Sequence, residues 1–453
     1  MKKKNMNNMV TGVVKWILPF YLFTFLPFNV CAQDDLDLDV DIDEDDIIVT
    51  DEYGDEEITE FPEAMTYDLD SLMNLYMSKT YLDEDNSCRM KDENPIFTDE
   101  EYIDRLSRLP YIMEMSYNEV VKSCIERYSG RLRKSVSYML GASNFYMPIF
   151  EEALEAYDVP LELKYLPIIE SALNPRAVSR VGATGLWQFM LSTGKQYGLK
   201  INSLVDERRD PIKASYAAAN LLSDLYKVYG DWNLVIAAYN CGPGNINKAI
   251  ARSGGKRDYW EIYPYLPAET RGYVPAFIAA NYIMNYYCDH NICPMRSRLP
   301  ERTDTVMVNK NLHLQQIADV CGIDIEELRT LNPSYRRDIV PGANEPSAIR
   351  MSMPDVTKFL EMEDSVYRYK ADELLTRRAV VEINDDVPTF VHHKKKGRGS
   401  RATTKRGKRG RGAKVAATKR GKRGAAARQG GSKKKKGGAA TSKKKKGSKK
   451  KRK

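Results

Sequence analysis

A single acidic side chain interrupts an apolar run near the middle of the sequence. Glu170 lies in "YLPIIESALNP", among aliphatic residues that recur at helical spacing. Burial disfavours the charged form of a carboxyl, so an acid in such a position tends to keep its proton near neutral pH. A carboxylic acid that keeps its proton can donate it to the oxygen of a leaving group. The pattern therefore predicts a general acid at Glu170.

The residues that follow Glu170 add groups that could hold a ligand beside it. The stretch "GATG" predicts a turn tight enough for backbone to approach a ligand, and Trp187 and Gln188 then offer a stacking face and an amide. Tyr239 and Asn240 come later, at an expected helix end in "AAYNCGPG". A lone Glu in a helix is most often an exposed residue without a catalytic role. The occurrence of these features together and in order favours an active site.

Helices must position these groups. Between residues 95 and 298 apolar residues recur every three or four positions, which is typical of amphipathic helices. The stretch "DPIKASYAAANLLSDLYKVYG" has the clearest bounds, with Asp210 as N-cap, Pro211 at the first helical position and Gly230 as C-cap. We expect an all-α domain over residues 95–298.

A smaller unit of mixed character follows over residues 301–355. "TVMVN" and "AIRMSMP" predict strands, and "LHLQQIADVCG" and "DIEELRTLNP" between them predict helices. This order predicts a β-α-α-β module. Residues 356–391 predict a further helix and strand that act as a linker. The expected fold class is thus mainly α, with a small α+β module after the helical domain.

The amino-terminal residues carry the marks of export. Three lysines precede an apolar run that ends in "NVCAQ", which predicts a signal peptide over residues 1–32 and cleavage before Gln33. Two alternatives are an uncleaved anchor, since the run is nearly long enough to span a bilayer, and lipidation of Cys31. All three place the protein outside the cytoplasm, in the periplasm or cell envelope.

Two segments of opposite charge flank the expected domains. Residues 33–94 are acidic and residues 392–453 are almost entirely Lys, Arg, Gly, Ala and Ser, within a chain of formal net charge +8. Both contain too few apolar residues to form a core, so we expect an acidic disordered lead and a basic disordered tail.

The cysteines and histidines indicate a disulfide and no metal. Removal of the signal peptide leaves six of the seven cysteines, an even number that suits an oxidising compartment. Cys288 and Cys293 are the most plausible local pair. The four histidines lack the spacing of known metal sites. We expect no metal and no cofactor.

Five motifs together resemble a known enzyme family. These are "YLPIIESALNP", "GATGLWQFM", "DERRDPIKASYAAANLL", "NLVIAAYNCGPG" and "LPAETRGYVPAFIAA". In this order they resemble the catalytic domain of family 1 lytic transglycosylases, which has a goose-lysozyme-like fold, and most closely the membrane-bound lytic transglycosylase D group. The resemblance covers about residues 109–287, under half of the chain.

The resemblance implies cleavage of the β-1,4 bond between N-acetylmuramic acid and N-acetylglucosamine in peptidoglycan. It implies that Glu170 protonates the glycosidic oxygen and then serves as the base while a 1,6-anhydro ring closes. The 2-acetamido group of the substrate would replace the second carboxylate that ordinary glycosidases need. Tyr273 would hold Glu170, and substrate or cleft contacts would come from Ser171, Gln188, Tyr239, Asn240, Trp187 and Met190.

Each supporting residue has a plainer interpretation. Ser171 could bond only backbone, Tyr239 and Tyr273 could be core aromatics, and Met190 could simply pack. At the level of the protein, the alternatives are a hydrolytic muramidase on the same fold and a non-catalytic scaffold that binds the cell wall.

The two carboxyl-terminal segments suggest binding partners. Residues 303–354 resemble a LysM module, which implies a shallow groove for N-acetylglucosamine-containing glycans, although "NKNLHL" stands where such modules have a Gly-Asp-Thr turn. A structural spacer is the alternative. The basic tail could bind anionic wall polymer, lipopolysaccharide or phospholipid head groups, the last with peripheral membrane contact, or it could pair with the acidic lead. The export signal argues against nucleic acid, which such a tail would otherwise suggest.

Overall fold

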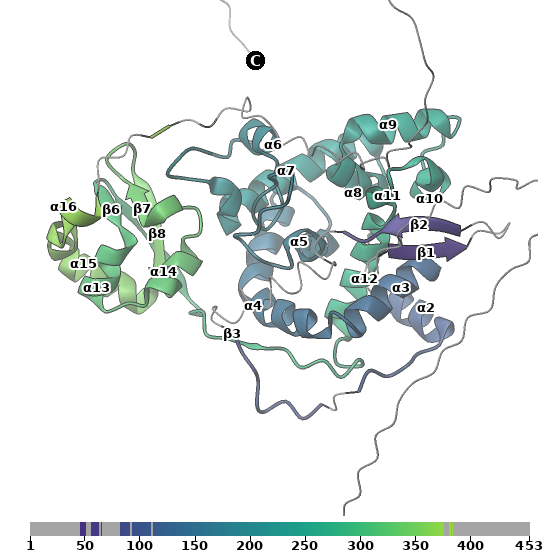
Figure 1. Cartoon of the computed structure of the whole chain (residues 1–453), viewed down its shortest axis with the longest axis horizontal. Helices are drawn as coiled ribbons and strands as arrows, with labels where there is room; N and C mark the ends of the chain where they lie inside the picture. Colours follow the sequence, from purple (N-terminus) through teal and green to yellow (C-terminus); the bar gives the residue numbers. More distant parts are fainter. Residues whose placement is uncertain are drawn as a thin grey trace, which may run out of the picture. The chain divides into compact units, whose positions relative to one another are not determined.

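The computed structural model describes residues 46–50, 56–62, 65, 82–90, 93–109, 112–375, 380–381 and 383. The expected signal peptide, with Cys31, and the basic tail lie outside these ranges, as does most of the acidic lead. The described part is mainly helical (Figure 1). It has two hydrophobic cores, a large one in the helical domain and a smaller one in the following module. Within these ranges no helix is both long and apolar enough to cross a membrane. The expected fold class is confirmed.

The helical domain is arranged around one buried helix, α12 (Tyr273–Tyr286). Every residue of α12 from Tyr273 to Met284 is buried, and the helix packs against α3, α5 and α8. Because it is apolar on all sides, α12 can be covered by other helices from every direction. The other helices are α2 (Asp99–Arg108), α3 (Glu119–Ser129), α4 (Arg133–Glu155), α5 (Leu166–Ser171), α6 (Leu191–Gln196), α7 (Pro211–Tyr229), α8 (Trp232–Cys241), α9 (Pro243–Arg252), α10 (Tyr259–Ile262) and α11 (Ala268–Arg271).

Short 3-10 turns join several of these helices. They are η2 (Leu161–Tyr165), η3 (Glu207–Arg209) and η4 (Tyr263–Tyr265). The predicted bounds of α7 are confirmed. The Asp210 carboxylate accepts hydrogen bonds from the backbone N–H groups of Ile212 and Lys213, and Gly230 ends the helix in the left-handed conformation with φ of 68°.

The following module has the predicted β-α-α-β order and additional elements. Strand β5 (Thr303–Val308) pairs antiparallel with β8 (Ser347–Ser352), and α13 (Leu314–Cys321) and α14 (Ile325–Leu331) lie between them in sequence. A second pair consists of β6 (Asn311–His313) and β7 (Ile339–Pro341), and η5 (Arg336–Asp338) precedes β7. The sequence pattern had not indicated this second pair.

The helix after β8 belongs to the module's core. Helix α15 (Met353–Arg368) extends beyond residue 355, where we expected the module to end, and α16 (Ala371–Leu374) follows it. Phe359 and Val366 of α15 are fully buried in the core of the module. The buried Gln316 amide of α13 donates to the Val366 carbonyl at 3.1 Å. Residues just past 355 therefore complete the module and do not form a linker.

The described part of the acidic lead is folded, which corrects the expectation of disorder for these residues. Strand β1 (Asp46–Thr50) pairs antiparallel with β2 (Glu56–Glu60), and this hairpin packs on α3 and α11 (Figure 1). The Thr59 and Tyr263 hydroxyls lie 3.0 Å apart. The Arg127 side chain donates to the Met65 carbonyl at 2.8 Å. The lead is thus anchored to the helical domain through contacts with residues distant in sequence.

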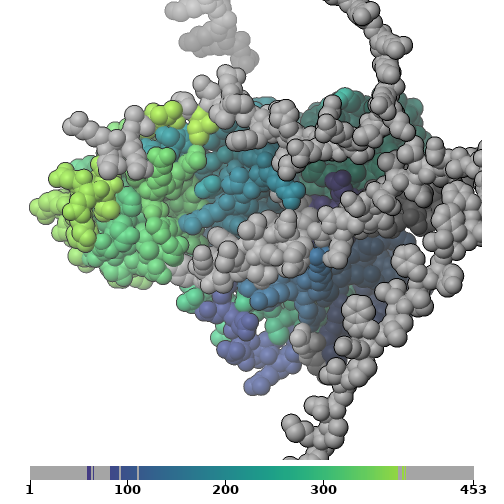
Figure 2. Space-filling view, viewed as in Figure 1, coloured from purple at the N-terminus to yellow at the C-terminus, as the bar shows by residue number. Residues whose placement is uncertain are grey.

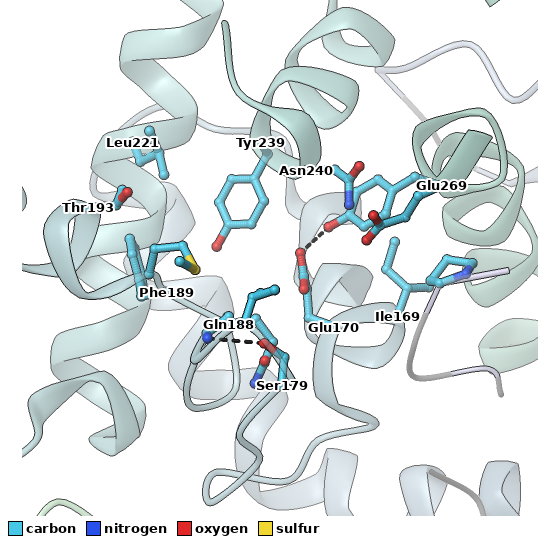
Figure 3. Close-up of a pocket in the computed structure, with 15 residues that line it drawn as sticks. Ile169, Glu170, Ser179, Gln188, Phe189, Thr193, Leu221, Tyr239, Asn240 and Glu269 are labelled. Carbon is cyan, nitrogen blue, oxygen red and sulfur yellow. Dashed lines mark hydrogen bonds between the residues drawn. The ribbon is translucent and has the colours of Figure 1, made fainter. Parts of the chain in front are cut away.

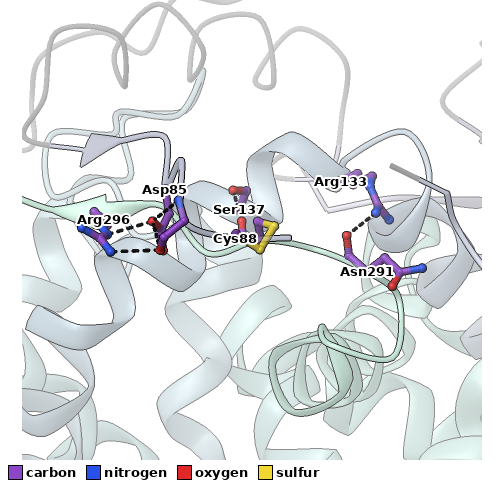
Figure 4. The surroundings of a disulfide bond; sticks show 8 residues. Asp85, Cys88, Arg133, Ser137, Asn291 and Arg296 are labelled. Atoms are coloured by element: carbon purple, nitrogen blue, oxygen red, sulfur yellow. Dashed lines mark hydrogen bonds and ion pairs between the residues drawn. A yellow bond between two sulfur atoms is a disulfide. The ribbon is translucent and has the colours of Figure 1, made fainter. Parts of the chain in front are cut away.

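A disulfide provides a second anchor for the lead. Cys88 is bonded to Cys293, with the two Cα atoms 6.0 Å apart (Figure 4). Cys288 forms no disulfide and is exposed. The predicted Cys288–Cys293 pair is therefore wrong. Beside the disulfide, β3 (Leu82–Asp83) pairs with β4 (Arg296–Ser297), and the Arg296 guanidinium lies 2.9 Å from the Asp85 carboxylate. These contacts join two segments separated by 205 residues in the chain.

We expect Cys88→Ser to lower the free energy of unfolding by about 2–4 kcal/mol, because a cross-link over a long loop restricts the unfolded chain. Urea unfolding of the oxidised protein measures the difference. Cys288→Ser is the matched control, since that thiol is free and exposed, and it should leave the midpoint in place. Equal stability of the Cys88→Ser variant and the wild type would contradict the expectation.

Candidate active site

A cavity of about 180 Å³ opens beside Glu170 in the helical domain. Figure 3 shows Glu170, Gln188, Tyr239 and Asn240 pointing toward a common space from different elements. The cavity is lined by Pro62, Ile169, Glu170, Ser179, Val181, Ala183, Gln188, Phe189, Met190, Thr193, Leu221, Tyr239, Asn240, Glu269 and Tyr273.

Glu170 is held at the end of the short helix α5 by a phenol of α12. The Tyr273 hydroxyl donates a hydrogen bond to Oε1 of Glu170 (Figure 3). Burial first, and then the negative charge of the Glu170 carboxylate, raise the pKa of the Tyr273 phenol well above its ordinary value. Tyr273 therefore keeps its proton near neutral pH and is the hydrogen-bond donor to Glu170.

The glycine turn that faces Glu170 is closed by its own backbone. Thr184 and Phe189 exchange two hydrogen bonds of 3.1 Å, N–H to C=O in each direction. Gly185 lies at the base of this turn with φ of +89°, and a Cβ there would be only 1.9 Å from the Arg208 carbonyl oxygen. Only glycine fits a backbone so close to another chain segment.

Gln188 presents its side chain to the cavity from this closed turn. Its φ is 45°, a left-handed conformation that few residues other than glycine adopt. Its Nε2 atom donates to the Gly185 carbonyl at 2.7 Å. That bond fixes the orientation of the amide, so the side-chain carbonyl of Gln188 is the group that can accept a hydrogen bond from a ligand.

Helix α8 supplies the opposite wall through Tyr239 and Asn240. The Tyr239 hydroxyl donates to the Trp187 carbonyl at 2.6 Å, and this bond links α8 to the glycine turn. Burial, with a smaller contribution from the Glu170 charge, raises the pKa of the Tyr239 phenol well above its ordinary value. Oδ1 of Asn240 accepts from the buried Thr270 hydroxyl at 2.8 Å, which leaves the Asn240 amide N–H groups for other acceptors.

Most of the residues singled out from the sequence meet at this cavity. Glu170, Gln188, Met190, Tyr239, Asn240 and Tyr273 all line it. Ser171 and Trp187, which were expected to contact the substrate, do not line this cavity. The Ser171 hydroxyl is buried within hydrogen-bond distance of the Leu186 carbonyl, at 2.9 Å, and it ties α5 to the glycine turn.

The buried indole of Trp187 packs in the core. Its Nε1 atom donates to the Ser215 hydroxyl at 2.9 Å, and its ring meets the edge of Phe150. An apolar indole beside an apolar helix fills the core in preference to a polar cavity. Trp187 contributes to the site through its backbone carbonyl, which accepts a hydrogen bond from the Tyr239 hydroxyl.

Glu269 and Pro62 are among the residues of the cavity wall that were not predicted from the sequence. Glu269 on α11 is a second carboxylate, and its place four residues before Tyr273 in "LPAETRGYV" is the signal that could have indicated it. Pro62 comes from the lead segment, after β2, and no local pattern could have placed it there. Among the described residues, no group of His, Cys, Asp and Glu is arranged to hold a metal ion.

Two family models match parts of the chain. Residues 147–262 match the family model of the transglycosylase SLT domain, and residues 302–368 match that of the LysM-like domain of the lytic transglycosylase MltD. The chain is 34% identical over 213 residues to the membrane-bound lytic murein transglycosylase D of Escherichia coli K12, covering 45% of each protein.

Two further comparisons cover smaller parts of the chain. The chain is 32% identical over 124 residues to the soluble lytic murein transglycosylase of Escherichia coli K12, covering 26% of this chain and 19% of that protein. A crystal structure of the 70 kDa soluble lytic transglycosylase from Escherichia coli aligns with a TM-score of 0.28 and 28% identity, over 32% of this chain and 25% of that one. The chain spans less than half the length of these curated relatives. The similarity is thus to the transglycosylase SLT domain in the helical domain and to the LysM-like domain of MltD in the module that follows.

Proposed function

We propose that this protein is a peptidoglycan lytic transglycosylase. It would cleave the β-1,4 bond between N-acetylmuramic acid and N-acetylglucosamine and form a 1,6-anhydro ring on the muramic acid. The observation that carries the proposal is the Glu170 carboxyl in the wall of a cavity, held by the Tyr273 phenol and faced by Gln188, Tyr239 and Asn240. The relatives that share this domain are named as murein transglycosylases, which agrees with the proposed substrate.

The reaction would need Glu170 as both acid and base. The Glu170 carboxyl protonates the glycosidic oxygen, and the N-acetylglucosamine unit leaves with a new 4-hydroxyl. The carbonyl oxygen of the muramic 2-acetamido group attacks the anomeric carbon as that bond breaks. The Glu170 carboxylate then takes the proton of the muramic 6-hydroxyl, whose oxygen displaces the acetamido oxygen and closes the anhydro ring. No water is consumed, and Glu170 ends with the proton it had at the start.

The neighbouring residues would orient the sugar for these steps. Tyr273 fixes the Glu170 carboxyl, so the proton is delivered from one position. The Asn240 amide, which Thr270 orients, would donate to the acetamido carbonyl or to a sugar hydroxyl. The Gln188 carbonyl would accept from the acetamido N–H. Met190 is exposed at the rim of the cavity, where it would contact the glycan.

A hydrolytic muramidase is the second candidate, and Glu269 is the observation that favours it. Ordinary glycosidases use two carboxylates, one of which activates a water or acts as nucleophile. Glu269 gives this cavity a second carboxylate. In the hydrolytic reaction water would take the place of the muramic 6-hydroxyl, and the products would carry reducing ends.

We further propose that the protein works in the cell envelope, as the export signal in its sequence suggests. The basic tail would contact an anionic surface there, through wall polymer, lipopolysaccharide or phospholipid. Lysine and arginine blocks bind such surfaces through charge, without a folded recognition site.

The products of digestion distinguish the two reactions. Mass spectrometry of muropeptides should show anhydro products, each lighter by one water than its hydrolysed counterpart. Glu170→Gln should lower turnover by about 10²- to 10⁴-fold, because it removes the proton donor and the base. Glu269→Gln, the matched change at the second carboxylate, should keep most of the turnover. Reducing ends throughout, together with a Glu269→Gln variant as inactive as Glu170→Gln, would favour the muramidase.

Tyr273→Phe should lower kcat by about 10- to 100-fold, since a hydrogen bond to a charged group contributes about 1.5–3 kcal/mol. Steady-state digestion of solubilised peptidoglycan measures this effect. Tyr265→Phe is the control, because the Tyr265 side chain is exposed and does not line the cavity. A Tyr273→Phe variant with wild-type kcat would show that the phenol does not support Glu170.

Binding through the tail should depend strongly on salt. Full-length protein should sediment with anionic vesicles or anionic wall polymer at low ionic strength and be released as salt is raised toward 0.5 M, because exposed charges are screened. A chain that ends at residue 391 should not sediment under either condition. Equal binding by the two chains would place the contact outside the tail.

A further inference from the structure

The LysM-like module contacts the catalytic domain at the loop of residues 200–206. The Arg336 backbone N–H donates to the Leu204 carbonyl at 2.7 Å, and the Asp206 N–H donates to the Ser334 carbonyl at 2.9 Å. A salt bridge of 2.5 Å between Lys200 and Glu345 adds a charged contact at the surface. In Figure 2 the green surface of the module adjoins the blue-teal surface of residues near 200.

The apolar part of this junction is separate from both domain cores. Leu204 and Val205 of the loop and Ile339 of the module form a small buried cluster against which Tyr335 packs. Neither the large core of the catalytic domain nor the core of the module includes these three side chains. Changing one of them should therefore loosen the junction and leave both domains folded.

The same loop continues directly into a buried ion pair, Asp206 with Arg208. Nε and Nη2 of Arg208 donate to the two carboxylate oxygens of Asp206, each at 2.9 Å. Both residues are buried, with exposed fractions of 2% for Asp206 and 8% for Arg208. A two-pronged bond of this kind fixes the plane of the guanidinium as well as its position.

The third guanidinium nitrogen of Arg208, Nη1, bonds to the glycine turn. Nη1 donates to the carbonyls of Gly182 and Phe189, each at 3.1 Å, on either side of Gln188. The Arg208 carbonyl also lies directly behind Gly185. A continuous series of bonds thus runs from Ser334 of the module through Asp206 and Arg208 to the turn that presents Gln188 to the cavity.

We propose that the LysM-like module is a positioning element of the active site: by docking on residues 200–206 it holds Arg208, and Arg208 fixes the turn that carries Gln188 opposite Glu170. This inference rests on the proposed function and adds a role for the module that needs no glycan bound to it. A small displacement of a binding group is enough to slow a reaction about a hundredfold.

Ile339→Asp tests the proposal in the full-length protein. The change places a carboxylate in the apolar cluster, so it should undock the module. Met307→Asp is the matched control, because Met307 is an exposed apolar residue on another strand of the module, outside the cluster. Hydrogen exchange at the Asp206 and Arg336 amides reports docking, and both should exchange faster in Ile339→Asp only.

Kinetic assays on two substrates distinguish a module that positions the active site from a module that only tethers the enzyme to glycan. We expect Ile339→Asp to lower kcat about 10- to 100-fold, with KM little changed, on both a short soluble glycan strand and insoluble peptidoglycan. A module that served only as a tether would raise KM on the insoluble substrate and leave turnover of the soluble strand unchanged. Ile339→Asp should also lower kcat by a smaller factor in a Gln188→Ala background than in the wild type, because both changes affect the same turn.

Faster exchange at the two amides with wild-type kcat on the soluble strand would overturn the proposal. Should Ile339→Asp fail to fold, Leu204→Ala tests the same cluster from the catalytic side. If neither variant alters exchange, the cluster does not dock the module and the proposal is likewise overturned. An inactive wild type would overturn the proposed function itself, whereas an active wild type with insensitive variants would overturn this inference alone.

Discussion

The hydrogen bond from Tyr273 to Glu170 is the interaction on which the site depends. Helix α5 has only six residues, too few to be stable alone, so Glu170 must be positioned by tertiary contacts. The phenol comes from the fully buried helix α12, and Ser171 fastens the end of α5 to the Leu186 carbonyl. The carboxyl is thereby held between the most buried helix of the domain and the glycine turn. A rigid support of this kind would suit the two successive proton transfers that we propose for Glu170.

The glycine turn is held in place by contacts with segments that are distant in the sequence, including one in the LysM-like module. Its backbone closes on itself, Tyr239 binds it from α8, and Arg208 holds it from behind. Arg208 is in turn fixed by Asp206, whose backbone bonds to the LysM-like module. The side chains of Leu186, Trp187 and Phe189 anchor the turn in the core, and these polar contacts fix the course of its backbone. Residues of two domains therefore determine where Gln188 lies.

Local sequence patterns predicted the features that depend on residues close together in the chain. The caps of α7 followed from Asp210 and Gly230, and the motifs that carry the family resemblance indicated Glu170 and Tyr273 before any contact between them was known. The failures concern distant contacts. Cys293 pairs with a residue 205 positions away, and no spacing rule could choose it over a near neighbour. The hairpin of the lead, the β6–β7 pair and the buried place of the Trp187 indole likewise depend on packing between remote segments.

A crystal structure of the Glu170→Gln variant with a bound muropeptide strand tests the central claim most directly. We expect a glycosidic oxygen about 3 Å from the side chain at position 170. We also expect the acetamido group of the adjoining muramic acid beside Gln188 and Asn240. A glycan bound in the cavity with no glycosidic oxygen near position 170, or one bound away from the cavity, would contradict the account.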